Sequence, residues 1–382
     1  MIRFGPEASP PQVWAVEDDA VQLCWGDLPA GPVTATSRSG NAAATVDHAG
    51  GPGSLDLASL LPDTAVTIDL RWTGGATTLD AITLPSPPGP QLTRFATISD
   101  LHLGAVTWGA LRTMVDRSDH PVPHPYRCAS AAVAEAVAWG ASYLVIKGDA
   151  VHHELPDHFE YLARLVDEFP DLPMLLIPGN HDVDARSEVI PTTVGERGLP
   201  YVRAVDHVDL PGVRIIAADT TVRGRGVGTV ERVGPAIEAR VAEADRPSFV
   251  AIHQQLQPAR LPRYWPAGIP APGSTAFLDR LDRLDSPVTI SSGHTHRNRS
   301  RRHGSLLLTE VASTKDWPGV WAGYAVHEGG IRQVVRRIAA PEAMAWTEYS
   351  RGALLGLWSR WSPGPIEQRC LTNAWAEDRS YA

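Results

Sequence analysis

The sequence predicts an α/β protein whose main domain is preceded by a small all-β sandwich, and three observations support this. Beyond residue 92, apolar runs of strand length alternate with longer stretches of helical spacing, as in domains whose central strands are buried on both faces. Before residue 84, apolar and polar residues alternate in short segments, which is typical of strands that bury one face. Between these regions, residues 84–92 read LPSPPGPQL, a composition typical of a stiff linker.

Residues 1–84 are expected to form the all-β sandwich. In AVTIDLRW (65–72) apolar residues recur at every second position, and AVQLCWGD (20–27) shows the same alternation. Short strands of this kind, separated by turns rich in glycine, proline and aspartate, favour an antiparallel sandwich. With the paired features VQLCW and LLPDTAVTIDL, the segment resembles a fibronectin type III domain.

Length and composition indicate a globular protein with room for more than one domain. The chain has 382 residues, of which 43% are hydrophobic and 20% charged, and its net charge is −9. An acidic balance argues against broad binding to nucleic acid or to anionic membranes. The three cysteines have no paired spacing, so neither a disulfide framework nor a zinc knuckle is expected. The N-terminus lacks a hydrophobic signal core, and no apolar run reaches the ~18 residues of a membrane helix, so a cytoplasmic protein is expected.

Five apolar runs of the α/β region each end in residues that can bind a metal. In open α/β sheets, ligands bind beyond the carboxyl ends of the strands, so these side chains should meet at one edge. Residues two apart in an extended segment point to the same side, so His294 and His296 should project together. The strand-end residues are Asp100, His102, Asp149, Asn180, His253, His294 and His296.

The seven side chains combine oxygen and nitrogen donors without a thiolate, and they suffice for two ions that share one carboxylate. Such donors suit divalent manganese, iron (Fe²⁺ or Fe³⁺) and zinc better than Cu(I) or an iron–sulfur cluster. Two ions roughly 3.5–4 Å apart form the clamp that hydrolyses phosphate esters. Gly148, Gly179 and Gly293 stand beside the predicted ligands, where glycine lets the backbone approach a metal closely.

The order of these motifs is that of a known family. Asp-x-His at 100–102, Gly-Asp at 148–149, Gly-Asn-His-Asp at 179–182, His253 and Gly-His-Thr-His at 293–296 together resemble the calcineurin-like metallophosphoesterase superfamily. The resemblance covers roughly residues 94–330, and the ligand set is most similar to that of the class III cyclic-nucleotide phosphodiesterases.

The resemblance implies a fold, a ligand assignment and domain limits. It implies a four-layer α/β/β/α sandwich over residues 92–340, after a linker at 85–91 and before a tail at 341–382. The first ion would be held by Asp100, His102, Asp149 and His296. The second would be held by Asp149, Asn180, His253 and His294, with Asp149 bridging the pair.

The resemblance also implies a mechanism. A water between the two ions loses a proton near neutral pH and attacks the phosphorus as a bridging hydroxide. His181 resembles the histidine that contacts the phosphoryl group and protonates the leaving oxygen, with Asp182 fixing its orientation; a structural role for His181 is the alternative. In purple acid phosphatases a metal-binding tyrosine occupies the position of His152, so no tyrosinate iron site is expected here.

These residues indicate an enzyme that hydrolyses a phosphodiester of a small molecule, a 3′,5′-cyclic nucleotide among the candidates. The alternative is a phosphomonoesterase acting on a nucleotide, a sugar phosphate or a phosphoprotein. A nuclease is less favoured because of the acidic balance, and a non-catalytic scaffold is disfavoured because every ligand position is filled. No membrane partner is expected, and the oligomeric state stays open, a homodimer included.

Two further patterns have alternative interpretations. The tail contains four tryptophans (Trp346, Trp358, Trp361 and Trp375), which are expected to pack against the body of the protein; a lid over the site or a dimer contact is the alternative. Alternating arginines follow the Gly-His-Thr-His motif at positions 297, 299 and 301. They could guide an anionic substrate or form a solvated strand face.

Overall fold

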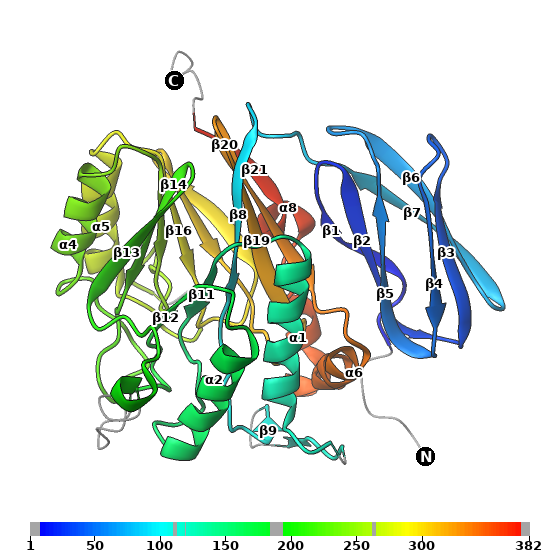
Figure 1. Ribbon diagram of the computed structural model, residues 1–382, viewed down its shortest axis with the longest axis horizontal. Helices are drawn as coiled ribbons and strands as arrows, with labels where there is room; N and C mark the ends of the chain where they lie inside the picture. The colour runs from blue at the N-terminus through cyan, green and yellow to red at the C-terminus, as the bar shows by residue number, and fades with distance from the viewer. Residues whose placement is uncertain (1–7, 110–112, 119, 184–193, 262–264, 376–382) are drawn as a thin grey trace.

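The computed structural model describes residues 8–109, 113–118, 120–183, 194–261 and 265–375. All nine residues predicted to bind metal or to act in catalysis lie within these ranges. Two sheets in the N-terminal part and two larger sheets in the rest of the chain form most of the molecule (Figure 1). None of the helices in the described ranges combines the length and the apolar composition that crossing a bilayer requires.

The N-terminal part contains two antiparallel sheets. One consists of β1 (Gln12–Val16), β2 (Ala20–Leu28) and β5 (Gly51–Ala58). The other consists, in spatial order, of β4 (Ala43–His48), β3 (Gly31–Ser37), β6 (Ala65–Trp72) and β7 (Gly75–Ile82). The predicted alternation holds in β6, where every second residue from Val66 to Leu70 is buried. The likeness to a fibronectin type III domain and the limits of this domain stay predictions.

The remaining strands form two sheets of six strands. The first sheet has the spatial order β12 (Met174–Ile177), β11 (Leu144–Lys147), β8 (Gln91–Ile98), β19 (Val320–His327), β20 (Gly330–Arg337) and β21 (Leu371–Ala374). The second has the order β13 (Val205–Leu210), β14 (Val213–Ala218), β15 (Ser248–Ala251), β16 (Val288–Ser292), β18 (Leu306–Glu310) and β17 (Arg299–His303). The strands β8, β11 and β12 are mutually parallel, as are β14, β15, β16 and β18.

The two six-stranded sheets pack face to face. Phe95 of β8 lies 4.9 Å from Phe249 of β15, ring centroid to ring centroid, and Tyr324 of β19 lies 4.7 Å from the same Phe249 ring. Helices α4 (Gly234–Ala242) and α5 (Ala271–Asp282) pack on the outer face of the second sheet through a separate apolar cluster. Helices α1 (His124–Ala138) and α2 (Pro156–Glu168) lie on the side of the first sheet (Figure 1).

Residues 85–91, predicted to be a stiff linker, are fixed to the second half of the chain. The carbonyl oxygen of Gly89 lies 3.0 Å from Nδ1 of His327, and Pro85 accepts a hydrogen bond from Oγ1 of Thr372 at 2.7 Å. The backbone N–H of Gly329 also donates to Pro88 at 2.9 Å. This proline-rich segment therefore runs along the end of the β19–β20 hairpin, and its role as a linker between domains stays a prediction.

Buried polar contacts join the N-terminal sheets to the first six-stranded sheet. The carboxylate of Glu17 accepts hydrogen bonds from Arg336 at 2.8 Å and from Arg332 at 3.1 Å, and all three side chains are at least nine-tenths buried. The side chain of Gln22 donates to the carbonyl of Arg337 and accepts from its N–H. Because buried charges need their partners, this interface holds the two parts of the chain firmly together.

Candidate metal centre

All five predicted strand ends meet in one place, although they come from both six-stranded sheets. Strands β8, β11 and β12 of the first sheet supply residues 100–102, 149 and 180, and strands β15 and β16 of the second sheet supply residues 253 and 294–296. The expected convergence at the carboxyl ends of parallel strands is therefore present. It spans the junction of two facing sheets, which the spacing of motifs could not reveal.

The first group of side chains consists of Asp100, His102 and His296. One ligand atom from each lies within 4.8 Å of the others, and all three residues are buried. Nε2 of His296 is 3.4 Å from Oδ1 of Asp100. Three donors converging in a buried space are the start of a metal site.

The second group consists of Asp149, His253 and His294, whose ligand atoms also lie within 4.8 Å of one another. Oδ1 of Asn180 is 3.3 Å from Nε2 of His253, so the amide joins this group. Oδ2 of Asp149 is 3.3 Å from that same nitrogen and 3.7 Å from Nε2 of His102 in the first group. Asp149 therefore lies between the two groups, where the sequence predicted a bridging carboxylate.

The hydrogen bonds of the histidines leave one ring nitrogen of each for the centre. Nδ1 of His253 is 2.8 Å from the carbonyl of Lys147, and Nδ1 of His296 is 2.8 Å from Oδ2 of Asp316. Nε2 of His294 is 3.3 Å from the carbonyl of Ala267. Histidines that bind metals are usually oriented in this way, through an acceptor on the nitrogen that does not face the ion.

A buried ring nitrogen of His102 also indicates a metal site. Nε2 of His102 is inaccessible to solvent and has no hydrogen-bond partner in the described part of the chain. A buried polar nitrogen without a partner is costly unless an ion or water satisfies it. Together with the donor set, this orphan nitrogen shows that the residues fit a pair of divalent ions.

The electrostatics of the centre favour ionised carboxylates. Burial alone would raise the pKa of Asp149, but His253 and His181 outweigh it and hold that pKa well below its usual range. Burial would likewise lower the pKa of His253, but Asp149 raises it to about 9. The negative charge of Asp149 thus stabilises positive charge in the centre. In this structure that positive charge is the proton on the His253 imidazole.

The backbone is strained at five of the seven predicted ligands. Their φ angles lie between 47° and 67°, in the left-handed region, which only a few per cent of residues other than glycine adopt. Such conformations cluster at functional sites because the surrounding structure must hold them there. The five residues are Asp100 (55°), His102 (47°), Asp149 (49°), His294 (67°) and His296 (51°).

Glycines admit the close approaches that the sequence predicted. A Cβ atom on Gly179 would lie 2.2 Å from the backbone nitrogen of Asp149, and one on Gly293 would lie 2.7 Å from Oδ2 of Asp100. Real Cβ atoms essentially never approach other atoms so closely. These two positions therefore need glycine for the ligand carboxylates to sit where they do.

The two predicted catalytic residues are near the centre, but one contact differs from the prediction. The ring of His181 lies 4.5 Å from that of His102, and its Nδ1 is 3.0 Å from the carbonyl of His152. Asp182 was expected to orient His181. Instead, its carboxylate accepts hydrogen bonds from the backbone N–H groups of Gly179, Ala150 and Val151. Asp182 therefore holds the backbone of residues 150–151 and 179 in place, whereas the carbonyl of His152 is the group that contacts the His181 ring nitrogen.

Three residues beside the centre were missed by sequence reasoning. Asp316 accepts from His296, Lys315 lies at 3.2 Å from the same carboxylate, and the Trp108 ring stacks on the His296 ring with centroids 5.2 Å apart. Burial alone would raise the pKa of Asp316, but His296 and Lys315 outweigh it and lower that pKa to about 2. None of the three residues comes directly after a strand, since Trp108 lies well beyond the end of β8 and Lys315 and Asp316 lie well beyond the end of β18, so the strand-end pattern did not single them out.

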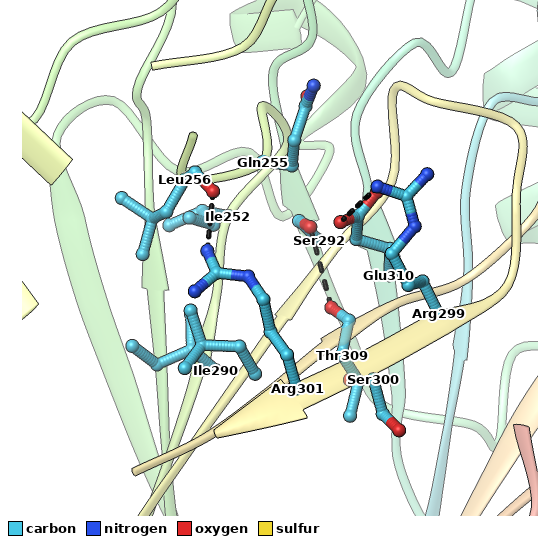
Figure 2. A pocket seen from close by; sticks show the side chains of 11 residues that line it. Ile252, Gln255, Leu256, Ile290, Ser292, Arg299, Ser300, Arg301, Thr309 and Glu310 are labelled. Carbon is cyan, nitrogen blue, oxygen red and sulfur yellow. Dashed lines mark hydrogen bonds and ion pairs between the residues drawn. The ribbon is translucent and has the colours of Figure 1, made fainter. Parts of the chain in front are cut away.

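The arginines after Gly-His-Thr-His have structural contacts. Nη1 of Arg299 lies 3.8 Å from the buried carboxylate of Glu310, and Arg301 donates to the carbonyl of Leu256 at 2.6 Å. These contacts surround a cavity of about 10 Å³, enough for roughly one water, between β16, β17 and β18 (Figure 2). Arg299 and Arg301 are partly buried and tie β17 to its neighbours.

The chain is similar to proteins of known families. The family described as calcineurin-like phosphoesterase matches residues 93–298, more than half of the chain. A protein of Psychrobacter arcticus named "Probable cyclic nucleotide phosphodiesterase" is 21% identical over 177 residues, and a glycerophosphodiester phosphodiesterase of Enterobacter lignolyticus is 25% identical over 174 residues. Each alignment covers 45% of this chain and 62% of the relative, so the chain matches less than two thirds of either relative's length.

A solved structure shares the fold. The crystal structure of a dimetal phosphatase from Danio rerio superposes with a TM-score of 0.50 at 14% identity, over 65% of this chain and 97% of that one. At this identity the likeness concerns the arrangement of helices and strands alone. The five motifs from Asp100 to His296 all lie within the family match, whereas Asp316 and the tail lie beyond it.

Proposed function

Because the chain belongs to the calcineurin-like phosphoesterase family, we propose that it hydrolyses phosphoric esters at a dinuclear centre of divalent metal ions, and that its substrate is a phosphodiester. The observation that carries this proposal is the position of Asp149, with Oδ2 3.7 Å from His102 and 3.3 Å from His253. A single carboxylate shared by two donor groups is the arrangement that a pair of ions requires.

In this proposal the seven strand-end residues hold the ions. Asp100, His102 and His296 bind one, Asn180, His253 and His294 bind the other, and Asp149 binds both. When bound, two such ions supply Lewis-acid stabilisation of the phosphoryl charge and activation of water. Oxygen and imidazole donors favour manganese, iron or zinc.

His181 is proposed as the proton donor to the leaving oxygen. Its ring lies against that of His102, at 4.5 Å between centroids, so it borders the space where a phosphoryl group would bind. If its Nδ1 donates to the carbonyl of His152, the ring is fixed and Nε2 faces the substrate. A fixed imidazole that can hold a proton on Nε2 suits general acid catalysis.

The choice of a phosphodiester rests on the similarity to two phosphodiesterases. A small-molecule diester, a cyclic nucleotide among the candidates, fits the proposal, and a phosphomonoester is the alternative. The cytoplasmic location, the absence of nucleic acid among the partners and the oligomeric state stay predictions.

The test compares two model esters. Protein loaded with Mn²⁺ is assayed on bis(p-nitrophenyl) phosphate and on p-nitrophenyl phosphate. The proposal expects a higher kcat/KM for the diester and loss of both activities after chelation. A higher kcat/KM for the monoester would establish a phosphomonoesterase, and no turnover of any ester in a broad panel would contradict hydrolysis itself.

A further inference from the structure

A buried carboxylate outside the family match contacts one of the proposed ligands. Asp316 lies in the segment between β18 and β19 and is fully buried. Its Oδ2 is 2.8 Å from Nδ1 of His296, whereas Nε2 of that ring faces Oδ1 of Asp100 at 3.4 Å. The imidazole is therefore held between two carboxylates, with Asp316 on the side away from the centre.

Asp316 is itself held by two donors. Nζ of Lys315 donates to Oδ2 at 3.2 Å, and Nε1 of Trp358 donates to Oδ1 at 3.2 Å. Lys315 also lies 3.8 Å above the centroid of the Trp108 ring. Every oxygen of this carboxylate thus has a partner, which is the condition for a buried charge to be tolerated.

The C-terminal segment packs around the same histidine. Trp358 begins the short helix α7 (Trp358–Trp361), and its ring lies 6.2 Å from that of His296 at an interplanar angle of 65°. Trp108 stacks on His296 with an interplanar angle of 6°. Ser362, directly after α7, donates from its hydroxyl to the backbone carbonyl of His296. Trp358 and Ser362 therefore contact the ring and the backbone, respectively, of one predicted ligand.

We propose that Asp316 is a positioning residue for His296, and that Trp358 and Ser362 of the C-terminal segment keep Asp316 and His296 in the geometry that one of the two metal sites requires. The inference rests on the proposed dinuclear centre and adds to it a part of the chain that the family match does not include. An N–H donated to a carboxylate fixes the tautomer and direction of a metal-binding imidazole and makes the opposite nitrogen a better ligand.

The inference predicts an effect on one metal site only. His253 and His294 are oriented by the backbone carbonyls of Lys147 and Ala267, so they do not depend on Asp316. Loss of a carboxylate that orients a metal-binding histidine typically reduces metal affinity about 10–100-fold. Removal of the Asp316 charge should therefore weaken the site of Asp100, His102 and His296 and leave its neighbour almost unchanged.

The experiment titrates Mn²⁺ into metal-free full-length protein by isothermal calorimetry, with Asp316→Asn, Trp358→Phe and Trp361→Phe beside the wild type. Asparagine keeps the shape of the side chain and removes its charge. Phenylalanine at 358 keeps an aromatic ring but removes the indole N–H that donates to Asp316 and to the carbonyl of Trp317. Trp361 lies on the same helix but is 52% exposed, so it is the matched control. We expect one of the two Mn²⁺ affinities to fall about 10–100-fold in Asp316→Asn, to fall less in Trp358→Phe, and to stay at the wild-type value in Trp361→Phe.

Other outcomes overturn the inference. Two unchanged affinities in Asp316→Asn would show that the contact does not position His296. Equal weakening of both sites, with a lower Tm for the metal-free variant, would leave Asp316 with a role in folding alone. A wild type that binds no Mn²⁺, Zn²⁺ or iron would contradict the proposed function itself, and this result is distinct from the other two because it concerns the unaltered protein.

Discussion

Oδ2 of Asp149 lies 3.7 Å from Nε2 of His102 and 3.3 Å from Nε2 of His253. One carboxylate oxygen thus touches both donor groups. His102 follows a strand of the first six-stranded sheet and His253 follows a strand of the second, so this oxygen marks the junction of the two sheets. The position of this oxygen joins the two groups of predicted ligands into one centre.

Asp149→Ala should therefore remove both metal ions together with the activity. Without the carboxylate, each donor group loses one ligand and the two ions lose the negative charge between them. The measurement is elemental analysis of purified protein after gel filtration. A variant that still carried two equivalents of metal would show that Asp149 does not bridge, and the ligand assignment would need to change.

His181→Ala should keep its metals and lose activity by roughly 10²–10⁴-fold. If the ring donates a proton to the leaving oxygen, the loss is largest for an alkoxide leaving group and small for p-nitrophenolate, which needs little protonation. The measurement compares kcat for an alkyl and a p-nitrophenyl ester of the same phosphoryl group.

Equal losses for both esters would assign His181 to positioning the phosphoryl group. Loss of metal from the variant would make it a ligand. The proximity of His102, His152 and His181, whose ligand atoms lie within 4.8 Å of one another, makes metal content the necessary control.

The sequence predicted that the strand-end side chains would lie together, and they do, whereas their roles as metal ligands stay predictions. Polar residues directly after apolar runs gave the seven strand-end positions, because a parallel strand brings its carboxyl end to the site wherever it lies in the sheet. Asp316 escaped prediction because it does not come directly after its strand, β18, and the sequence named Trp358 only as a residue of the tail, without its contact to Asp316. Asp316 meets His296 across 20 residues and Trp358 meets Asp316 across 42, and those contacts depend on how the tail folds back.

The same limit applies to contacts between the two parts of the chain. The proline-rich composition of residues 85–91 predicted a stiff linker but could not show that its carbonyls accept hydrogen bonds from the β19–β20 hairpin and from the strand beyond it. Trp346 and Trp358 pack in the interior as expected from the tail's composition, whereas Trp361 is half exposed. Composition predicts that a segment packs, but only tertiary contacts decide which of its side chains do.

Glu17→Ala should destabilise the protein by about 1–3 kcal/mol, because Arg332 and Arg336 lose the buried carboxylate that they share. The two arginines keep Asp18 and Asp56 as carboxylate partners. The measurement is urea unfolding of the metal-free protein. Glu243→Ala is the control, since Glu243 pairs with Arg240 on the surface and such pairs contribute about 0–1 kcal/mol. Equal and small effects of the two substitutions would show that the interface between the N-terminal sheets and β20 adds little to stability.

Gly179→Ala should disrupt the centre through the backbone. The added Cβ would lie 2.2 Å from the nitrogen and 2.3 Å from Oδ1 of Asp149, and neither the loop nor the carboxylate can move without displacing a ligand. We expect loss of metal binding together with a lower Tm, since overpacking a rigid site costs about 1–3 kcal/mol or more.

Gly273→Ala provides the matched control for this substitution. Gly273 lies in α5 with no atom within 4 Å of the added Cβ, and alanine in a helix is more favourable than glycine by about 0.8–1.0 kcal/mol. This variant should bind metal normally and unfold at the same or a slightly higher temperature. Wild-type affinity for two ions in Gly179→Ala would contradict this prediction. It would show that the loop of residues 179–182 can adjust to the added Cβ, and that the close approach of the Gly179 backbone does not fix the position of the Asp149 carboxylate.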